Sequence, residues 1–539
     1  MSLKWVNRQL KKKWLCIFIL AEILTFFSFA RSSAVSNAAG PRVTGIVVPH
    51  HAVALDLIEE TFRCSANQDI KRIILLSPDH FRRSTTPFAT TLEDFQTLGG
   101  CVKSDDEAVN EILKNNSTST STLFFREHGV QILLPYIAKY FPNAKVLPIA
   151  LRIDSKKVHW ASLIDTLEPL VTSETLIVQS TDFSHYLSHQ QARYHDQQTM
   201  NTLALGSPES ILELKQPEHL DSKAAQFIHM ELQRRKGAVG PIVLQNRNCQ
   251  QYSPVLERET TSYITQVYHR PSEHEFIWNA GEDSETWIFA GDFFFGRYLR
   301  SFLHDQVKLE KLKDSILKKT LGRPIVVNLE GVLLPRVENP KSQRLLHMEQ
   351  RPIIDFLKSI NVKIVSLANN HAFDAGQSGM DYTANILRAN GITPLLEGEV
   401  HDQGTFRITA LSDLCNIRSP LGSRITPQII ENITDSNIRF PAFAFIHWGK
   451  EFDATPQTSQ NRISSWLEAT PISMIIGSHP HVSSENIQPW KRKDGLIVWS
   501  LGNFIFDQPM GNGALVEIRF FKNGTYSSRR INLGNLVYN

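Results

Sequence analysis

The chain has 539 residues, which is too long for one hydrophobic core and predicts two domains. Hydrophobic residues make up 42% of the chain and charged residues 21%, a composition that excludes both an intrinsically disordered chain and a membrane protein with many spans. The net charge is +3, but the first 39 residues carry six Lys or Arg and one Glu, so the remainder is slightly acidic and predicts no nucleic-acid-binding surface.

Residues 1–39 have the pattern of an export segment. A basic stretch through Lys13 precedes the apolar run Trp14–Ala30, and small residues follow Arg31. The run lies at the short end of the roughly 17–25 residues that cross a bilayer, so a cleaved signal peptide and an uncleaved N-terminal membrane anchor both remain open. In both cases the basic residues stay inside and the body is exported. We therefore expect an extracytoplasmic protein that is periplasmic, secreted or tethered to the membrane.

Residues 41–271 alternate short apolar runs with amphipathic patterns of helical period, which predicts an α/β domain. Helices are expected at 130–140, 156–170 and 222–235, and the Ser- and Thr-rich run 115–122 is expected to be a surface loop. A disulfide between Cys64 and Cys101 is conceivable outside the cytoplasm, and no C-x-x-C pair is present. The expected strands are 43–48, 72–76, 145–151, 175–179, 241–244 and 262–268.

A polar, acidic stretch at residues 272–285 predicts a linker, and a second α/β pattern fills residues 286–539. No repeat period relates the two halves. The C-terminus is expected to form a hairpin, with strands 514–520 and 526–533 joined by a turn at Lys522-Asn523-Gly524. The other strands expected in this domain are 287–290, 325–328, 363–367, 442–446, 472–476 and 496–499.

Residues of the kind that bind metals follow almost every strand of the second domain. In an open α/β sheet, ligands bind beyond the carboxyl ends of the strands, so these residues are expected to meet in one crevice. Gly477-Ser-His-Pro-His481 is the most specific of these motifs, because two imidazoles two residues apart can reach adjacent metals. Imidazole and carboxylate ligands favour manganese, iron or zinc over calcium. The expected ligands are Asp292, Glu330, Asn370, His447, His479 and His481.

These motifs resemble those of the CapA family, which is associated with capsule and poly-γ-glutamate synthesis. The resemblance covers about residues 286 to 507 and includes Gly291-Asp292, Leu367-Ala-Asn-Asn-His371, His447-Trp-Gly449 and Ser500-Leu-Gly-Asn503-Phe-x-Phe-Asp507. The family is related to the calcineurin-like metallophosphoesterases. The resemblance therefore implies an α/β sandwich of that type, with one or two divalent metal ions bound to it.

The resemblance also implies how the ligands are shared between two metals. One carboxylate can offer an oxygen to each metal, and Glu330 would bridge them in this way. Asp292 and His481 would complete one site, and Asn370, His447 and His479 would complete the other.

His371 is the catalytic residue that the resemblance implies, acting as a general acid or stabilising developing charge. The wider superfamily begins its first motif with Asp-x-His, whereas Phe294 stands at the histidine position here. The site at Asp292 therefore has fewer protein ligands, and a one-metal site or a different hydrolytic reaction remains open.

The first domain shows a similar arrangement of polar residues. Histidine-containing motifs follow three of its expected strands, and Glu127-His128 opens an expected helix. Over about residues 41 to 271 these motifs resemble the Memo-like proteins, also called AmmeMemoRadiSam system protein B, whose fold is related to class III extradiol dioxygenases. The pocket positions that the resemblance implies are His50, His80, Asp182 and His185.

The pocket of the Memo-like proteins often contains a Cys-Gly where this chain has Val239-Gly240, and Cys249 comes ten residues later. The loss of a thiolate ligand disfavours copper, whereas three histidines could hold one iron or zinc ion. The reaction of that family is poorly defined, so the resemblance implies a fold and a pocket and no substrate.

Together these features favour an exported metal-dependent hydrolase of the phosphoesterase type, which acts on a phosphoester or on a cell-surface polymer. The first alternative is a non-catalytic envelope component that binds or assembles a polymer and holds structural metals, and the replacements at Phe294 and Val239 favour it. The second alternative is a metal-dependent redox enzyme centred on the N-terminal pocket. Catalytic metals keep an open coordination position and structural metals do not. The exposure of the metal ligands therefore distinguishes an enzyme from a non-catalytic component.

Overall fold

The computed structural model describes residues 40–537, except 67, 256, 273, 279–283, 339–343, 416–424, 434–440, 492–493, 509–511 and 535. The chain divides into two compact units, Met1–Gly40 and Pro41–Asn539. The predicted export segment at residues 1–39, together with residues 273 and 279–283 of the predicted linker, lies outside the described residues. Within the described part of the chain, no helix is both long and apolar enough to cross a membrane.

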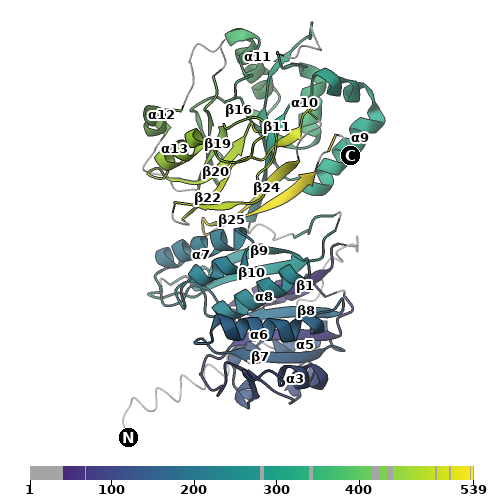
Figure 1. The fold of residues 1–539 in the computed structure, drawn as a ribbon, viewed down its shortest axis with the longest axis vertical. Helices are drawn as coiled ribbons and strands as arrows, with labels where there is room; N and C mark the ends of the chain where they lie inside the picture. The colour runs from purple at the N-terminus through teal and green to yellow at the C-terminus, as the bar shows by residue number, and fades with distance from the viewer. Residues whose placement is uncertain are drawn as a thin grey trace. The chain divides into compact units, whose positions relative to one another are not determined.

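The N-terminal part of Pro41–Asn539 is built on a ten-stranded sheet in the order β4-β5-β7-β2-β8-β1-β10-β9, with β3 and β6 off this path (Figure 1). Its central strands β7, β2, β8 and β1 are parallel, and β10 and β9 continue the sheet antiparallel. The strands are β1 (Val43–Val48), β2 (Arg72–Pro78), β3 (Phe88–Thr90), β4 (Phe95–Thr97), β5 (Gly100–Ser104), β6 (Thr118–Thr120), β7 (Lys145–Leu151), β8 (Thr175–Ser180), β9 (Val239–Asn248) and β10 (Ser262–His269).

Helices cover both faces of this sheet because its central strands are buried on both sides. Along β2, Ile73 and Leu75 pack in one core with α2 and α5, whereas Ile74 and Leu76 pack in the opposite core with α3, α6 and α8. Helices α6 and α8 lie in front of the sheet in Figure 1. The helices are α2 (Leu55–Arg63), α3 (Asp106–Ile112), α4 (His128–Gln131), α5 (Leu134–Tyr140), α6 (Lys157–Leu167), α7 (His189–Ala204) and α8 (Lys223–Arg235).

Two local predictions were wrong in this domain. The helix expected at residues 130–140 is two helices, α4 and α5, because Pro135 fits the first turn of a helix and cannot continue one. The run 115–122, expected to be a loop, contains β6, which pairs with β3. The disulfide considered between Cys64 and Cys101 is absent, since both are free thiols in the described structure.

The C-terminal part contains two larger sheets. The first has the order β16-β15-β12-β11-β24-β25 with β23 against β11, and the second has the order β17-β18-β19-β20-β22-β21. Strands β13 and β14 form a separate pair. The strands are β11 (Ser284–Phe293), β12 (Ile325–Leu329), β13 (Val332–Leu334), β14 (His347–Glu349), β15 (Val362–Ser366), β16 (Thr393–Leu395), β17 (Val400–Asp402), β18 (Arg407–Ser412), β19 (Ala442–His447), β20 (Ile472–Ser478), β21 (Gln488–Trp490), β22 (Gly495–Val498), β23 (Asn503–Ile505), β24 (Gly513–Phe521) and β25 (Tyr526–Gly534).

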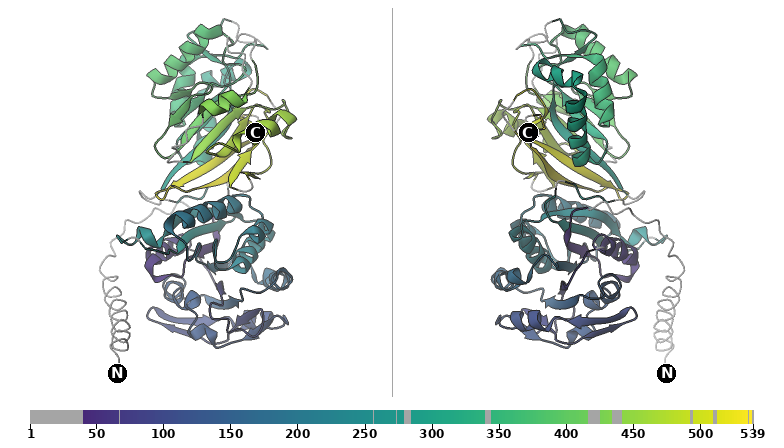
Figure 2. Two further views of the ribbon diagram at one scale, coloured as in Figure 1. Left: turned by 90° about the vertical axis from the view of Figure 1, so that its left-hand side faces the viewer. Right: turned by 90° about the vertical axis from the view of Figure 1, so that its right-hand side faces the viewer.

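These two sheets face each other across an aromatic core that includes Phe289, Phe406 and Phe443. Helices α9, α10 and α11 pack on the outer face of the first sheet, and α12 and α13 pack on the outer face of the second (Figures 1 and 2). Two sheets with helices outside them make an α/β sandwich, which confirms the expected fold class. The helices are α9 (Gln306–Thr320), α10 (Gln350–Ser359), α11 (Gly376–Ala389), α12 (Pro427–Ile433) and α13 (Thr458–Leu467).

The β24–β25 hairpin of the first sheet contacts β9, which is the edge strand of the N-terminal sheet. Nη1 of the buried Arg519 donates to the backbone oxygens of Val243 and Leu244, at 3.1 and 3.4 Å. At the hairpin turn, the amide of Asn523 donates to the backbone oxygen of Asn246 at 3.3 Å. Backbone acceptors along β9 therefore receive hydrogen bonds from a hairpin that is distant in sequence.

Candidate metal centres

The C-terminal site lies where strands of both sheets end. Asp292 is near the end of β11, Glu330 follows β12, and Asn370 and His371 follow β15 in the first sheet. In the second sheet, His447 is the last residue of β19, and the loop after β20 carries the remaining two histidines. Five of the six expected ligands are at most 5% exposed, namely Asp292, Glu330, His447, His479 and His481.

The ligand atoms form two groups that share one carboxylate. Each group has all its ligand atoms within 4.8 Å of one another, and Glu330 belongs to both. Its Oε1 lies 3.8 Å from His447 Nε2, and its Oε2 lies 4.0 Å from His481 Nε2. The first group is Glu330, His447 and His479, and the second is Asp292, Glu330 and His481.

Neighbouring polar side chains orient these ligands. Nε2 of His447 lies 2.9 Å from Oδ1 of Asn370, which places the expected amide ligand beside the first group. On the other side of the same ring, Nδ1 of His447 lies 3.1 Å from the Ser478 hydroxyl. The Asn328 amide donates to Asp292 Oδ1 at 2.8 Å, and Nδ1 of His481 lies 2.8 Å from Oδ1 of Asn503. Contacts of this kind behind a ligand fix its orientation.

The loop that carries the two histidines has a strained backbone. His479 and His481 have φ values of 98° and 60°, a region in which residues other than glycine cost roughly 1–3 kcal/mol. The backbone N–H of His479 donates to Asp292 Oδ2 at 2.9 Å, which ties this loop to β11. A Cβ at Gly477 would lie 2.0 Å from the backbone oxygen of Trp499, so the motif requires glycine there.

Burial makes charge costly at this site. Burial, with the nearby Asp292 carboxylate, raises the pKa of Glu330 well above its usual range, and burial also raises the pKa of Asp292. Burial lowers the pKa of His479 to about 3, so its imidazole is neutral and able to bind a metal. Glu330 Oε2 and His479 Nδ1 are buried without a hydrogen-bond partner among the described residues. A divalent cation would satisfy both atoms and neutralise the two carboxylates, so this set of ligands fits a metal.

His371 lies beside the shared carboxylate. Its Nδ1 lies 2.8 Å from Asp374 Oδ2, and its Nε2 lies 3.9 Å from Glu330 Oε1. Asp374 also accepts the backbone N–H of Leu346 at 2.7 Å, so the carboxylate that orients the ring is itself fixed. The side chain of His371 is 23% exposed and that of Glu330 is 2% exposed, so the His371 ring lies between the buried ligands and solvent.

The N-terminal domain contains a second cluster of histidines. His50, His80 and His128 have ligand atoms within 4.8 Å of one another. Asp221 Oδ2 lies 3.1 Å from His50 Nε2 and 3.6 Å from His80 Nε2. Asp182 accepts the backbone N–H of His50 at 3.0 Å, so this expected pocket residue is in place.

The third imidazole of this cluster differs from the expectation. His185 is not part of the group of ligand atoms, and its ring contacts Tyr186 instead. His128 takes this place because α4 begins there and Glu127 caps the helix, accepting the backbone N–H of Gly129 at 3.1 Å. The Glu127-His128 pair was a sequence signal for this residue, whereas no sequence pattern marked Asp221.

Carboxylates control the protonation of the N-terminal cluster. Burial alone would lower the pKa of His80, but hydrogen bonds to Asp221 and Glu127 raise it to about 10. Burial and the neighbouring charged imidazoles lower the pKa of His128 to about 4. Asp221 Oδ1 is buried without a hydrogen-bond partner in the described structure. Without a metal, His80 therefore holds a proton near neutral pH, and a metal ion would have to displace that proton to bind there. His128 is neutral and Asp221 supplies a carboxylate with an unsatisfied oxygen, so the imidazoles and this carboxylate together suit one metal ion.

Comparisons with known proteins match the two halves separately. Residues 29–255 match the family described as Memo-like protein, and residues 286–402 and 426–508 match the family described as bacterial capsule synthesis protein PGA_cap. The chain joins a Memo-like domain to a PGA_cap domain. This confirms both resemblances found in the sequence.

Individual relatives cover one domain each. The PGA_cap domain is similar to the PGA biosynthesis protein CapA of Bacillus subtilis (strain 168), with 25% identity over 44% of this chain and 68% of that protein. It is also similar to the capsule biosynthesis protein CapA of Bacillus anthracis, with 24% identity over 36% of this chain and 53% of that protein. The Memo-like domain is similar to a MEMO1 family protein of Nitrosopumilus maritimus (strain SCM1), with 24% identity over 31% of this chain and 62% of that protein. The last two matches thus span less than two thirds of the relative.

The two replaced ligand positions have different surroundings. In the PGA_cap domain, Phe294 is fully buried and packs against Phe506, with ring centroids 5.4 Å apart. In the Memo-like domain, Val239 is 37% exposed at the start of β9. Cys249 directly follows β9, and its Sγ lies 3.8 Å from Nδ1 of His51, the residue after His50. Its Sγ also lies 2.9 Å from the hydroxyl of Tyr263, so Cys249 contacts His51 and Tyr263 rather than the three clustered imidazoles.

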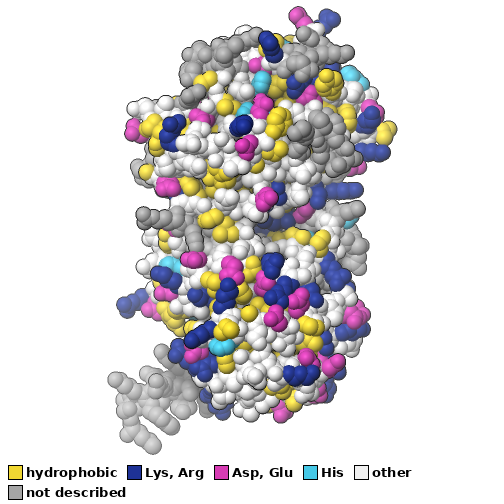
Figure 3. Space-filling model, viewed as in Figure 1, with side chains coloured by type: hydrophobic (Ala, Val, Ile, Leu, Met, Phe, Trp, Pro, Cys, Tyr) yellow, Lys and Arg dark blue, Asp and Glu magenta, His cyan; other side chains and the backbone are white. Residues whose placement is uncertain are grey.

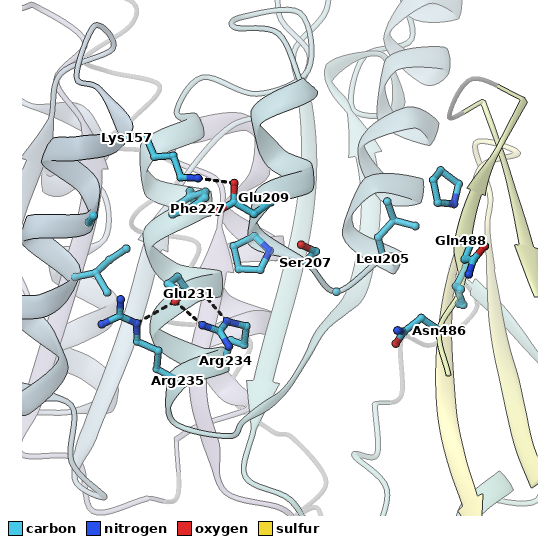
Figure 4. A pocket seen from close by; sticks show the side chains of 16 residues that line it. Lys157, Leu205, Ser207, Glu209, Phe227, Glu231, Arg234, Arg235, Asn486 and Gln488 are labelled. Atoms are coloured by element: carbon cyan, nitrogen blue, oxygen red, sulfur yellow. Dashed lines mark hydrogen bonds and ion pairs between the residues drawn. The ribbon is translucent and has the colours of Figure 1, made fainter. Parts of the chain in front are cut away.

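Apart from the two candidate metal sites, the structure has a hollow of about 680 Å³ that is open to solvent. Residues of α6 and α8 and residues 486–489 line it (Figure 4). Its lysine and arginine side chains are paired with acids: Lys157 with Glu209 at 2.6 Å, and Arg234 with Glu231 at 2.7 Å. Basic and acidic side chains are likewise interspersed on the face shown in Figure 3. This hollow presents no uncompensated charge for an ionic ligand.

Proposed function

We propose that this chain is an exported metal-dependent hydrolase that acts on a cell-surface polymer, such as a capsule polymer, or on a phosphoester. The observation that carries the proposal is Glu330, a buried carboxylate shared by two groups of metal-binding atoms. The names of the Bacillus relatives support capsule polymer metabolism as the setting. The basic and apolar residues 1–39 support export, either as a signal peptide or as a membrane anchor.

The ligands would be shared between two metals. Asn370, His447 and His479 would hold one metal with Glu330, and Asp292 and His481 would hold a second with the same carboxylate. A divalent cation supplies Lewis-acid stabilisation of charge on the oxygens of the reacting group. Manganese, iron and zinc all suit these ligands.

Hydrolysis adds a water molecule to the reacting phosphorus or carbonyl carbon while the bond to the leaving oxygen or nitrogen breaks. The leaving atom takes up a proton, and the water gives one up. Asp374 holds Nδ1 of His371, which leaves Nε2 on the side of the shared carboxylate. From this position the imidazolium would donate a proton to the departing oxygen or nitrogen of the cleaved bond.

The full chain, purified with its metal, tests this proposal through hydrolysis of a generic phosphodiester and of poly-γ-glutamate. His479→Ala is expected to lower the rate by on the order of 100-fold, because it removes a ligand of the first group. His401→Ala, which changes an imidazole on β17, is the matched control and is expected to retain activity. Metal-loaded protein that cleaves neither substrate would rule the hydrolase out.

Failure of that test would favour the alternative of a non-catalytic envelope component that binds or assembles polymer. Phe294 is the observation for it, because a buried aromatic ring fills the position of a ligand in the wider superfamily. Polymer binding by the unaltered, metal-loaded chain without any bond cleavage, and equal binding by His371→Ala, would support this alternative.

The Memo-like domain supports a second activity. The three clustered imidazoles and Asp221 resemble the ligand chemistry of non-haem iron sites, so we propose that this domain binds one iron or zinc ion. Iron in the purified chain, with oxygen uptake on addition of a catechol, would indicate a redox enzyme. Zinc alone would exclude one.

A further inference from the structure

Arg297 lies directly above the phenylalanine that replaces the histidine of the first metal-binding motif. Its guanidinium carbon is 4.9 Å from the centre of the Phe294 ring. The backbone folds back to allow this, with φ of 46° at Arg297. A Cβ at Gly296 would lie 2.4 Å from Phe294 Cζ, so glycine is required for the close approach. The chain therefore places a permanent cation against the aromatic ring that stands at the ligand position of the superfamily.

The acidic surroundings explain why a cation is stable here. Nη2 of Arg297 donates to Asp507 Oδ1 at 2.6 Å, and the two side chains are 11% and 3% exposed. Phe506, the residue before Asp507, packs its ring against Phe294 and against His481, with ring centroids 5.4 and 4.5 Å apart. The Arg297–Asp507 pair therefore lies beside the second group of ligand atoms.

The pairing with Asp507 uses only part of the guanidinium. Nε of Arg297 is buried and has no hydrogen-bond partner among the described residues. A guanidinium has five N–H donors in a planar fork, which matches the two oxygens of a carboxylate or the oxygens of a phosphate. Nε is closed off from solvent, so a substrate could reach only the outer nitrogens of the guanidinium, of which Nη2 is held by Asp507 and Nη1 has no hydrogen-bond partner among the described residues.

We propose that Arg297 is the substrate-recognition residue of this site and binds an oxyanion of the substrate, either a carboxylate along the polymer or a phosphoryl group. The proposal rests on the proposed hydrolase function and names the class of substrate that it acts on. The anion would lie between Arg297 and the metals and would share their positive charge. A neutral polymer would leave the charge of the guanidinium and its Nη1 donors without an anion, so the site would select against it.

The competing explanation is that Arg297 only joins two loops through Asp507. In that case its loss would lower stability and would not change ligand preference. Two variants separate the explanations. Arg297→Gln removes the cation, and Asp507→Asn keeps the cation while removing the charge of its partner.

Equilibrium binding by the full, metal-loaded chain tests the proposal without requiring turnover. The probes are inorganic phosphate, glutarate and the neutral glutaramide, and thermal unfolding checks that each variant is folded. Arg297→Gln is expected to weaken binding of at least one of the two anions by on the order of 10- to 100-fold, the effect of losing a charged hydrogen bond. Phosphate sensitivity alone would identify a phosphoryl substrate, and glutarate sensitivity alone a carboxylate polymer.

Two controls complete the experiment. Arg300→Gln changes a neighbouring arginine that pairs with Glu349, and it is expected to bind the anions as the unaltered chain does. Asp507→Asn is expected to bind them at least as tightly as the unaltered chain. Equal anion binding by Arg297→Gln and the unaltered chain would overturn the proposal. So would equal losses in Arg297→Gln and Asp507→Asn. A chain that binds anions through Arg297 and cleaves no substrate would refute the hydrolase and leave the recognition role intact.

Discussion

Asn370 and His447 meet at 2.9 Å although they follow strands of different sheets. Asn370 comes after β15 in the first sheet, and His447 ends β19 in the second. Their contact therefore closes the crevice between the sheets at the point where the first group of ligands lies. Replacing Asn370 therefore tests whether the two groups of ligands bind metal independently.

Asn370→Ala is expected to remove metal from the first group and to leave the group of Asp292 and His481 able to bind. Glu330→Gln is expected to lower total bound metal further, because an amide cannot offer an anionic oxygen to both groups. Elemental analysis of the purified variants measures this. His401→Ala is the control, and full metal content in Glu330→Gln would contradict the shared carboxylate.

In the Memo-like domain, His128→Ala is expected to lower bound iron or zinc substantially, whereas His185→Ala is expected to leave it unchanged. The reason is that His128 has a ligand atom within 4.8 Å of His50 and His80, and His185 does not. Metal titration of each variant, made with the PGA_cap ligands intact, measures the difference. The reverse order of effects would show that the expectation from the sequence was correct.

Asp196 is expected to make stability depend on pH. It is fully buried, and burial raises its pKa to about 7 from a reference value of 3.8, despite a 2.7 Å hydrogen bond from Ser184. Between these values the folded chain holds a proton that the unfolded chain has released, so stability falls as pH rises through this window. Asp196→Asn removes the effect, and its advantage over the unaltered chain is expected to grow between about pH 4 and pH 8 by on the order of 3 kcal/mol.

Denaturant unfolding at several pH values checks this expectation. Asp314→Asn, which changes an exposed carboxylate on α9, is the matched control and is expected to show a difference that does not vary with pH. A constant difference between Asp196→Asn and the unaltered chain would mean that Asp196 is ionised in the folded state throughout.

Arg519→Met is expected to destabilise the chain by about 2–4 kcal/mol, because it removes a buried cation and leaves backbone oxygens of β9 without their donor. Arg519 is 3% exposed and donates to Val243 and Leu244. Arg388→Met, at an exposed position on α11, is expected to change stability by less than about 0.5 kcal/mol. Equal unfolding midpoints for the two variants would show that the contact with β9 contributes little.

The sequence predicted the positions of the longer strands, but not always their extent. Strands β1 and β7 have the predicted boundaries, whereas β9 and β11 have ten residues each where four were expected, at 241–244 and 287–290, because their polar ends interrupt the apolar pattern. Strand β6 has three residues and forms because β3 lies beside it, which no local pattern records. Pro135 marks the division between α4 and α5, although the apolar period across residues 130–140 predicts one continuous helix.

The same distinction holds for the candidate sites: residues in short motifs were predictable, and residues brought in by tertiary contacts were not. The histidines of the Gly477-Ser-His-Pro-His481 motif could be recognised because their spacing and their glycine are local. Asp221 reaches His50 only because the segment before α8 packs beside the loop after β8, with the backbone N–H of Asp221 donating to Asp182 at 3.1 Å. Cys249 approaches His51 through strand pairing. Contacts that depend on tertiary structure leave no pattern in a single sequence.

The hydrogen bond from Asn523 to Asn246 joins residues that are 277 positions apart. At about 5–20 residues per second, a ribosome completes the hairpin roughly 14–55 s after β9 has emerged. Throughout that delay the outer edge of the Memo-like sheet lacks its cover, and an open edge can pair with another chain. A chain that crosses a membrane N-terminus first faces the same interval on the far side. The nascent protein thus depends on its last strands to cover the edge of its first domain, and a truncation that removes β24 and β25 would leave that edge open permanently.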